Sequence, residues 1–246
     1  MRDWDPGAST ALHECKQALE ERDIVRWLRE VTRAMWRPNA ERYEPSHLFD
    51  TPRGVAGLAA ENLRERMLAE YRAVSSPWRT RGIRLSVPHG SLLIEVGELA
   101  VHVVKAPGVQ LREPEWTTFA WGASATRHAA AARNAGTHVL PPPPIEGQLA
   151  FEFEFEVVPA GGNPVYRELF FVWAGDAIGL TAGWLGLPRL GGQRWLAVTP
   201  LWRDDAANLD PAAGDVPRPS AGVAFSEREA PRPVVSLKRR EGELAR

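Results

Sequence analysis

The stretch GIRLSVPHGSLLIEVGELAVHVVKAP, residues 82–107, decides the fold class, because its apolar residues recur at every second position. A period of two is typical of β-strands, whereas the segments before it repeat every three to four residues, as helices do. Turn-forming pairs interrupt the stretch at His89-Gly90 and at Gly97-Glu98. The three short strands expected here span residues 82–87, 91–97 and 99–107. Together they predict an antiparallel meander.

Helices are predicted for the residues before the meander. Ser9 is a suitable N-cap, and the apolar pattern loses phase near Arg22 and Asp23, where a bend is expected. Pro38 is expected to end the helical region, because proline lacks the backbone N–H that a helix interior needs. The segment after it is interpreted as a connector.

A further helix is expected from about residue 52 to 74. Thr51 is a good N-cap for it, and Pro52 suits the first helical position. His47 and Asp50, three residues apart, lie just before this helix. We interpret them as hydrogen-bonding groups at a helix start rather than as a ligand or acid-base pair.

Another helix and more strands are expected after the meander. The helix crosses over from about Thr117 to Asn134, and the alternation of FEFEFE at residues 151–156 predicts a strand. We expect that strand to form a hairpin with VYRELFFVWAG, residues 165–175, so that aromatic side chains of both lie on one core face. Two further strands are expected in AIGLTAGWLGLP, residues 177–188, and GQRWLAVTPLW, residues 192–202.

The sequence thus predicts an α+β protein, in which N-terminal helices pack on a mainly antiparallel sheet with one crossover helix. A chain of 246 residues, 44% of them hydrophobic, can bury a sizeable core. Proline, alanine and charged residues dominate after Arg203, which predicts a disordered C-terminal tail. The divisions expected are an N-terminal helical segment at 1–40, an α+β domain at 41–203 and a flexible tail at 204–246.

Composition excludes several classes of protein. The single cysteine, Cys15, cannot form an intramolecular disulfide. No apolar run approaches the roughly 20 residues of a membrane span, and the N-terminal residues lack the pattern of a signal peptide. We therefore expect a cytoplasmic protein with no membrane partner.

Opposite charges are segregated along the chain, although the net charge is only -1. Residues 22–84 contain 13 basic and 8 acidic residues, whereas residues 85–176 contain 5 and 10. One face of the predicted helix in the basic segment is a stripe of arginines. This arginine stripe consists of Arg22, Arg26, Arg29, Arg33 and Arg37. Two interpretations stay open, namely a face that binds nucleic acid or an acidic partner, and a solvated face whose charges pair within the chain.

The predicted strand at residues 151–156 has an acidic face. Strict alternation places Glu152, Glu154 and Glu156 on one side of it. Neighbouring carboxylates suggest a two-carboxylate glycosidase, but the Glu-x-Asp-x-x-Glu pattern of laminarinase-like enzymes lacks its aspartate here. The alternatives are a solvated strand face and a salt-bridging face, for which the arginine stripe is the candidate partner.

No sequence pattern supplies a catalytic or cofactor site. The six histidines are scattered without an HExxH pattern, and neither GASATR nor PAGGNP matches a phosphate-binding loop. The segment HVVK, from His102 to Lys105, lacks the acid two positions before the lysine that a nuclease of the restriction-enzyme type needs. We expect no catalytic residues, no metal and no cofactor.

Three segments resemble an uncharacterised family of high-G+C bacterial and phage proteins: SHLFDTPRGVAGLAAENLRERM, HGSLLIEVGELAVHVVKAP and GLTAGWLGLPRL. The resemblance spans about residues 9–203. That family is associated with genes for helix-turn-helix repressors and their metallopeptidase partners, which implies a context of mobile-element or stress regulation. The resemblance implies no activity and no catalytic residues.

The function expected from the sequence is that of a non-enzymatic regulatory or protein-interaction factor with an unidentified protein partner. A first alternative is a nucleic-acid-binding protein that uses the arginine stripe. A second alternative is a metal-dependent hydrolase that uses the three glutamates of the acidic face.

Overall fold

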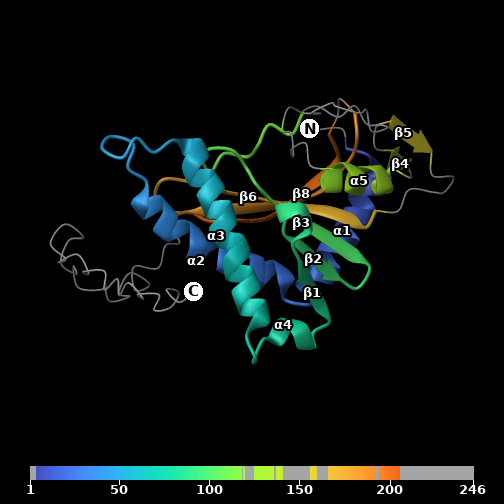
Figure 1. Cartoon of the computed structure of the whole chain (residues 1–246). Coiled ribbons are helices and arrows are strands. Elements are labelled where there is room, and N and C mark those ends of the chain that lie inside the picture. Colours follow the sequence, from blue (N-terminus) through green and yellow to red (C-terminus); the bar gives the residue numbers. More distant parts are fainter. Residues whose placement is uncertain are drawn as a thin grey trace, which may run out of the picture. The chain divides into compact units, whose positions relative to one another are not determined.

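The computed structural model describes the part of the chain between residues 4 and 205, with gaps (Figure 1). The described ranges are residues 4–117, 119, 125–135, 137–140, 156–159, 166–191 and 194–205. In two of them, 137–140 and 156–159, only the backbone is described. The predicted tail lies outside the described residues except for its first two residues.

The chain has the α+β fold that the sequence predicts. The helices are α1 (Pro6–Glu20), α2 (Ile24–Arg42), α3 (Pro52–Arg72), α4 (Pro77–Thr80) and α5 (Ala125–Asn134). The strands are β1 (Ile83–Ser86), β2 (Leu93–Val96), β3 (Leu99–Lys105), β4 (Thr137–Leu140), β5 (Glu156–Pro159), β6 (Glu168–Gly175), β7 (Thr181–Pro188) and β8 (Trp195–Arg203). One sheet has the order β1-β2-β3-β6-β7-β8, and β4 pairs with β5 separately. Within the larger sheet, only the described pairing of β3 with β6 is parallel.

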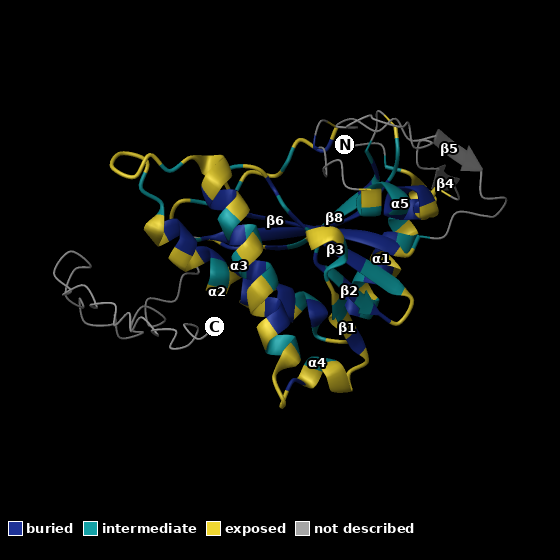
Figure 2. Cartoon of the chain, in the orientation of Figure 1, coloured by how far each residue is buried: buried dark blue, intermediate teal, exposed yellow. Residues whose placement is uncertain are grey.

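The two faces of the large sheet have separate hydrophobic cores. α1, α2 and α3 lie on one face, over alternate residues of the central strands such as Val101, Phe171 and Leu185. α5 and a segment containing Trp116 and Phe119 cover the other face. Figure 2 shows that the long helices are buried on one side and exposed on the other. Helices on both faces therefore bury the apolar surface of the sheet.

The N-terminal helices and the sheet belong to the same compact unit. This unit extends from Met1 to Ala206. The boundary expected at residue 40 falls inside α2, whose buried residues include Trp36 and Ala40. The first helices share one core with the sheet.

α2 continues past Pro38 to Arg42, so the prediction that this proline ends the helix is wrong. The Asn39 side chain donates to the backbone carbonyl of Met35 at 2.6 Å and accepts from Asn62 of α3 at 3.0 Å. These contacts hold the residues after the proline in place. They offset the single backbone hydrogen bond that proline removes from a helix.

α1 begins at Pro6 rather than after Ser9. Asp5 is the N-cap, because its Oδ1 accepts from the Ala8 N–H at 2.6 Å, and proline suits the following position. The predicted bend between the first two helices is confirmed. Asp23 has a φ of 59° and separates α1 from α2.

The local signals around α3 and the meander were interpreted correctly. Thr51 Oγ1 accepts a backbone N–H of the first turn of α3 at 3.0 Å, and β1, β2 and β3 are antiparallel neighbours. α5 ends at Asn134 as predicted, but it begins at Ala125 and not at Thr117. Thr117 lies instead in a turn next to Trp116, which is buried in the second core.

The hairpin predicted between residues 151–156 and 165–175 is wrong, because β6 has no free edge. β3 lies on one side of β6 and β7 on the other. All eight residues of β6 are buried, as expected for a central strand with both faces covered. Glu156 begins β5 and is the backbone pairing partner of Leu140 in β4. Residues 151–155 lie outside the described residues.

Candidate functional site

Lys105 is the last residue of β3, at the carboxyl end of the parallel strand pair, and is in register with Trp173 of β6. Its Nζ lies 4.9 Å from the centroid of the Trp173 ring and 5.0 Å from that of Trp36 on α2. The two indoles meet edge to face with their centroids 6.0 Å apart. An ammonium group within about 6 Å of a tryptophan face is attracted to it. Two aromatic side chains from distant parts of the chain therefore flank this lysine.

Trp36 is fixed by the end of β6. Its Nε1–H donates to the Asp176 carbonyl at 2.8 Å. The ring lies so close to Gly175 that a Cβ atom on this glycine would overlap the indole. Asp176 Oδ1 also accepts the backbone N–H groups of Ile178 and Leu180, at 3.1 and 2.9 Å. The close approach of the indole is the reason that glycine is needed at position 175.

The amine of Lys105 makes two hydrogen bonds. It donates to the Ala106 carbonyl at 2.8 Å and to the Gly108 carbonyl at 3.1 Å. Burial lowers the pKa of Lys105 to about 7, because the ammonium form loses its hydration. An amine with this pKa exists in both protonation states near neutral pH.

A cavity of about 590 Å³ lies beside Lys105, between the first half of α3 and the turn after β3. This volume is within the range of sites that bind small molecules. α3 supplies Pro52, Arg53, Ala56 and Ala60, and the turn supplies Ala106 and Pro107. The wall is mostly apolar, and its charged residues, Lys105 and Arg53, are both basic. Its charge favours an anionic ligand.

A second cavity of about 240 Å³ shares Ala60 with the first. Its charged lining residues are Arg64, Arg127 and Glu61. Arg127 of α5 donates to a backbone carbonyl of β3 at 3.3 Å, and burial lowers its pKa. Trp173 also lines this cavity, and its buried Nε1–H has no acceptor among the described residues. Two of the three charged residues that line the second cavity are thus arginines.

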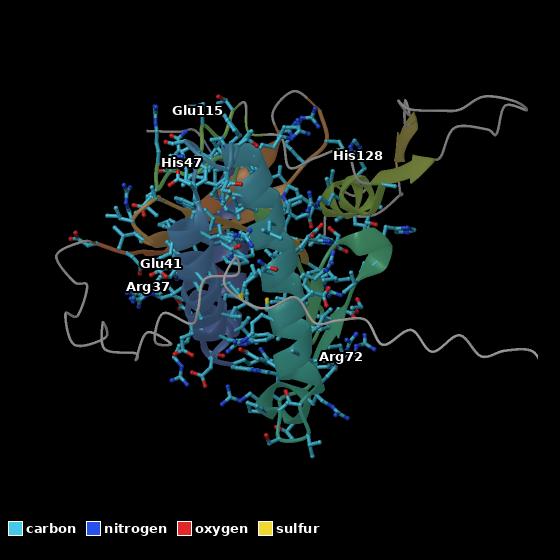
Figure 3. All side chains as sticks on the ribbon, turned by 60° about the vertical axis from the view of Figure 1, so that its left-hand side comes forward. Arg37, Glu41, His47, Arg72, Glu115 and His128 are labelled. Atoms are coloured by element: carbon cyan, nitrogen blue, oxygen red, sulfur yellow. The ribbon has the colours of Figure 1, made fainter. Side chains whose placement is uncertain are left out.

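The arginine stripe has partners within the chain. Four of its members pair with carboxylates: Arg26 with Asp23 and Glu30, Arg29 and Arg33 with Asp204, and Arg37 with Glu41. Figure 3 shows Arg37 and Glu41 near each other on α2. Arg22 donates to a carbonyl of α1 at 3.1 Å. The four paired side chains remain 45 to 68% exposed, so the stripe faces solvent although its charge is partly compensated.

Asp204, just after β8, is the buried acid of this set. Its side chain is only 5% exposed, and its oxygens lie 2.9 Å from Arg29 and 3.5 Å from Arg33. The N–H and the hydroxyl of Thr181 also donate to it, at 3.1 and 2.8 Å. The sequence assigned Asp204 to a flexible tail, but these donors anchor it beside β7. An acid that sequence reasoning missed thus links the stripe to the sheet.

The acidic face that the sequence predicts is described only in part. Glu152 and Glu154 lie outside the described residues, and of Glu156 only the backbone position in β5 is described. Its pairing with the arginine stripe stays a prediction.

Asp50 accepts the Glu44 N–H at 3.0 Å. This bond lies within the connector before α3, whereas the first turn of α3 is capped by Thr51.

A buried polar cluster on the other face of the sheet was also missed. His102 Nε2 lies 3.0 Å from Glu168 Oε2, and Arg133 of α5 pairs with the other carboxylate oxygen. Asn134 donates to the Glu168 carbonyl at 2.7 Å and accepts its N–H at 3.1 Å. Burial alone would raise the pKa of Glu168, but hydrogen bonds from His102 and Arg133 lower it. The cluster ties α5 to β3 and β6.

Comparison with models of protein families, with curated proteins and with solved structures found no match. The resemblance seen in the sequence therefore stays an expectation. Within the described ranges, no three His, Cys, Asp or Glu side chains gather closely enough to hold a metal ion. No helix in the described part of the chain is long and apolar enough to cross a membrane.

Proposed function

We propose that this protein is a non-enzymatic regulatory protein that binds a small organic anion in the cavity beside Lys105. The main support is the cavity of about 590 Å³ whose charged lining residues, Lys105 and Arg53, are both basic. Its apolar wall suits an apolar ligand body, and a few placed polar groups suffice to orient such a ligand. An anionic group would give the ammonium a charged partner in addition to its two carbonyl acceptors.

The position of the cavity supports a regulatory role. α3 and the turn after β3 bound it, while Trp36 brings α2 into contact with Lys105. A ligand held by Lys105 would stabilise the packing of these helices against the sheet and would favour the conformation that binds it. Such a ligand response would fit the mobile-element or stress context that the sequence resemblance implies.

Thermal melting of the full chain with 4-methylbenzoate tests this proposal, because the probe combines an apolar ring with a carboxylate. A probe at one hundred times its Kd would add about 2.7 kcal/mol to the free energy of unfolding and raise Tm by roughly 5 to 10 °C. Lys105→Met should reduce the rise, because it removes one of the two cations that line the cavity. Arg72→Met, at the far end of α3, should retain it (Figure 3). If neither this probe nor a panel of small carboxylates raises Tm, the proposal is wrong.

The exposure of the arginine stripe favours a second candidate, a nucleic-acid-binding protein. Side chains that remain 45 to 68% exposed can exchange their carboxylate partners for phosphates. A salt titration measures how the logarithm of the DNA-binding constant falls with the logarithm of the salt concentration. The magnitude of this slope should be smaller by about three in the triple variant Arg26→Ala/Arg29→Ala/Arg33→Ala. Negligible binding that is the same in wild type and variant would eliminate this candidate.

The metal-dependent hydrolase remains the third candidate, and no described contact supports it. If Glu152, Glu154 and Glu156 bound a divalent ion, Mg²⁺ or Mn²⁺ would raise Tm by mass action. Glu154→Gln should then remove that rise. A Tm that neither ion changes would count against the hydrolase.

A further inference from the structure

We propose that Lys105 forms a reversible imine with an aldehyde group of the ligand that occupies its cavity. The inference rests on the proposed function, because it takes the same cavity as the binding site. It adds the chemical class of the ligand, which is an apolar aldehyde that also has an acidic group. Lys105 is one of three lysines in the chain, together with Lys16 and Lys238.

The hydrogen bonds of Lys105 suit an uncharged amine. An ammonium group has three N–H donors, whereas a neutral amine has two and a lone pair. The carbonyls of Ala106 and Gly108 are two acceptors for this nitrogen. A neutral Lys105 would keep both hydrogen bonds and retain its lone pair for reaction with a carbonyl carbon.

The surroundings of Lys105 also favour reaction. Trp36 and Trp173 restrict the side chain at the wall of the cavity, so little orientational freedom is lost when a ligand arrives. Burial lowers the pKa of Lys105 to about 7, so at neutral pH a far larger fraction of this amine is uncharged than of an ordinary lysine. Lysines desolvated in this way are the ones that form Schiff bases. Lys16, in contrast, lies 3.8 Å from the carboxylate of Glu20.

The reaction needs no oxidant, reductant or metal. The lone pair of Nζ attacks the aldehyde carbon, and the carbonyl electron pair moves to oxygen, which takes a proton from the nitrogen. The resulting carbinolamine loses one molecule of water and leaves a C=N bond. Water reverses these steps and releases the aldehyde and the free amine, so the ligand is captured and not consumed.

Arg53 gives the ligand its second feature. It lines the same cavity from the first turn of α3, where the positive end of the helix dipole also favours an anion. An acid group near Arg53 and an aldehyde near Lys105 would use both cations of the cavity. Ala56 and Ala60, apolar residues of the same lining, would contact the body of the ligand.

Treatment of the full chain with 4-carboxybenzaldehyde and sodium cyanoborohydride tests the inference, because the reagent reduces an imine to a stable secondary amine. Peptide mapping by mass spectrometry then compares Lys105 with Lys16 and Lys238 in the same molecules, so no variant is needed. At neutral pH, Lys105 should react at least roughly tenfold faster than Lys16 and Lys238. Equal rates at the three lysines, or no adduct at Lys105, would overturn the inference.

Two controls separate this inference from the proposed function. Excess 4-methylbenzoate has the same ring and carboxylate but no aldehyde, and it should slow the labelling of Lys105 several-fold. An unchanged rate would place the reaction outside the cavity and overturn the inference. If 4-methylbenzoate raises Tm but no adduct forms at Lys105, the imine is wrong and the binding function stands. If neither probe binds, both fail. Lys105→Met should lose the fast adduct while its melting curve shows that it is folded.

Discussion

Replacement of Lys105 by methionine should stabilise the protein, and most strongly at low pH. Methionine places an unbranched apolar side chain of similar length between Trp36 and Trp173, and it needs no hydration. In the wild type, burial lowers the pKa of Lys105 from 10.5 to about 7. The folded state therefore binds this proton less readily than the unfolded state does, and the buried ammonium destabilises the fold.

The pH range of the effect follows from these two pKa values. Below pH 7 the amine is charged in both states, so the whole cost of burying the charge is present. Between about pH 7 and 10.5 only the unfolded state keeps the proton, and the free energy of unfolding rises with pH. At about 1.4 kcal/mol per pH unit, the difference between the two pKa values amounts to about 5 kcal/mol, of which about 4 kcal/mol falls between pH 6 and 10.

Urea unfolding of wild type and Lys105→Met at several pH values measures the effect. The stabilisation of the variant at pH 6 should exceed that at pH 10 by about 4 kcal/mol, because every other titrating group is common to both proteins. Arg72→Met provides the control, since its stability difference from wild type should not change with pH in this range. A difference between Lys105→Met and wild type that is independent of pH would refute the argument from burial. It would also remove the protonation argument for the imine.

Three further substitutions test the contacts around the site and the fold. Gly175→Ala should lower the free energy of unfolding by about 1 to 3 kcal/mol and abolish the response to 4-methylbenzoate, because the added Cβ would displace Trp36. Unchanged urea unfolding would show that the indole does not pack against this glycine. Asp204→Ala should lower the free energy of unfolding by about 2 to 4 kcal/mol in the same assay, since Thr181 and two arginines lose a buried acceptor. A loss under about 0.5 kcal/mol would contradict the burial of this carboxylate. Thr51→Ala should cost about 1 kcal/mol through loss of the α3 N-cap, whereas Thr51→Ser, which keeps the hydroxyl, should cost much less; equal losses would show that the cap contributes nothing.

The features that the sequence predicted correctly depend on neighbouring residues. Thr51 and Pro52 begin α3 because an N-cap hydroxyl and a preset φ act within one turn. The meander follows from alternation and from turns that join adjacent strands. The bend at Asp23 appeared as a loss of helical phase. Where the deciding interaction spans a few residues, the local sequence contains it.

The features that were missed depend on residues far apart in the chain. β6 was expected to pair with the segment just before it, although its apolar residues on both faces are typical of a central strand that has two neighbours. Its parallel partner, β3, ends more than sixty residues earlier. Pro38 was expected to end a helix because the contact between Asn39 and Asn62 is not visible in the local sequence. Tertiary contacts outweighed the local preference in both cases.

The site around Lys105 could not be predicted because its parts come from four elements. In the sequence, this lysine stands out only as part of an incomplete nuclease motif. Trp36 and Trp173, which flank it, lie on α2 and β6. One signal was present in the composition. Of the 30 basic residues only three are lysine, and one of these three ends a strand in the interior of the sheet. In a chain that otherwise uses arginine, a lysine at such a place indicates a role that arginine does not fill.

The chemistry of the two side chains explains why lysine suits position 105. A guanidinium group has five N–H donors and stays protonated in proteins, so burial there would leave donors unsatisfied. Among the described contacts, Lys105 Nζ has two acceptors, the carbonyls of Ala106 and Gly108, which equals the number of donors on a neutral amine. Lys105→Arg should therefore be less stable than Lys105→Met at every pH, because it adds donors without acceptors. If Lys105→Arg instead matched the wild type in stability and still bound 4-methylbenzoate, a permanent charge would suffice at this position, and the case for a reactive amine would fail.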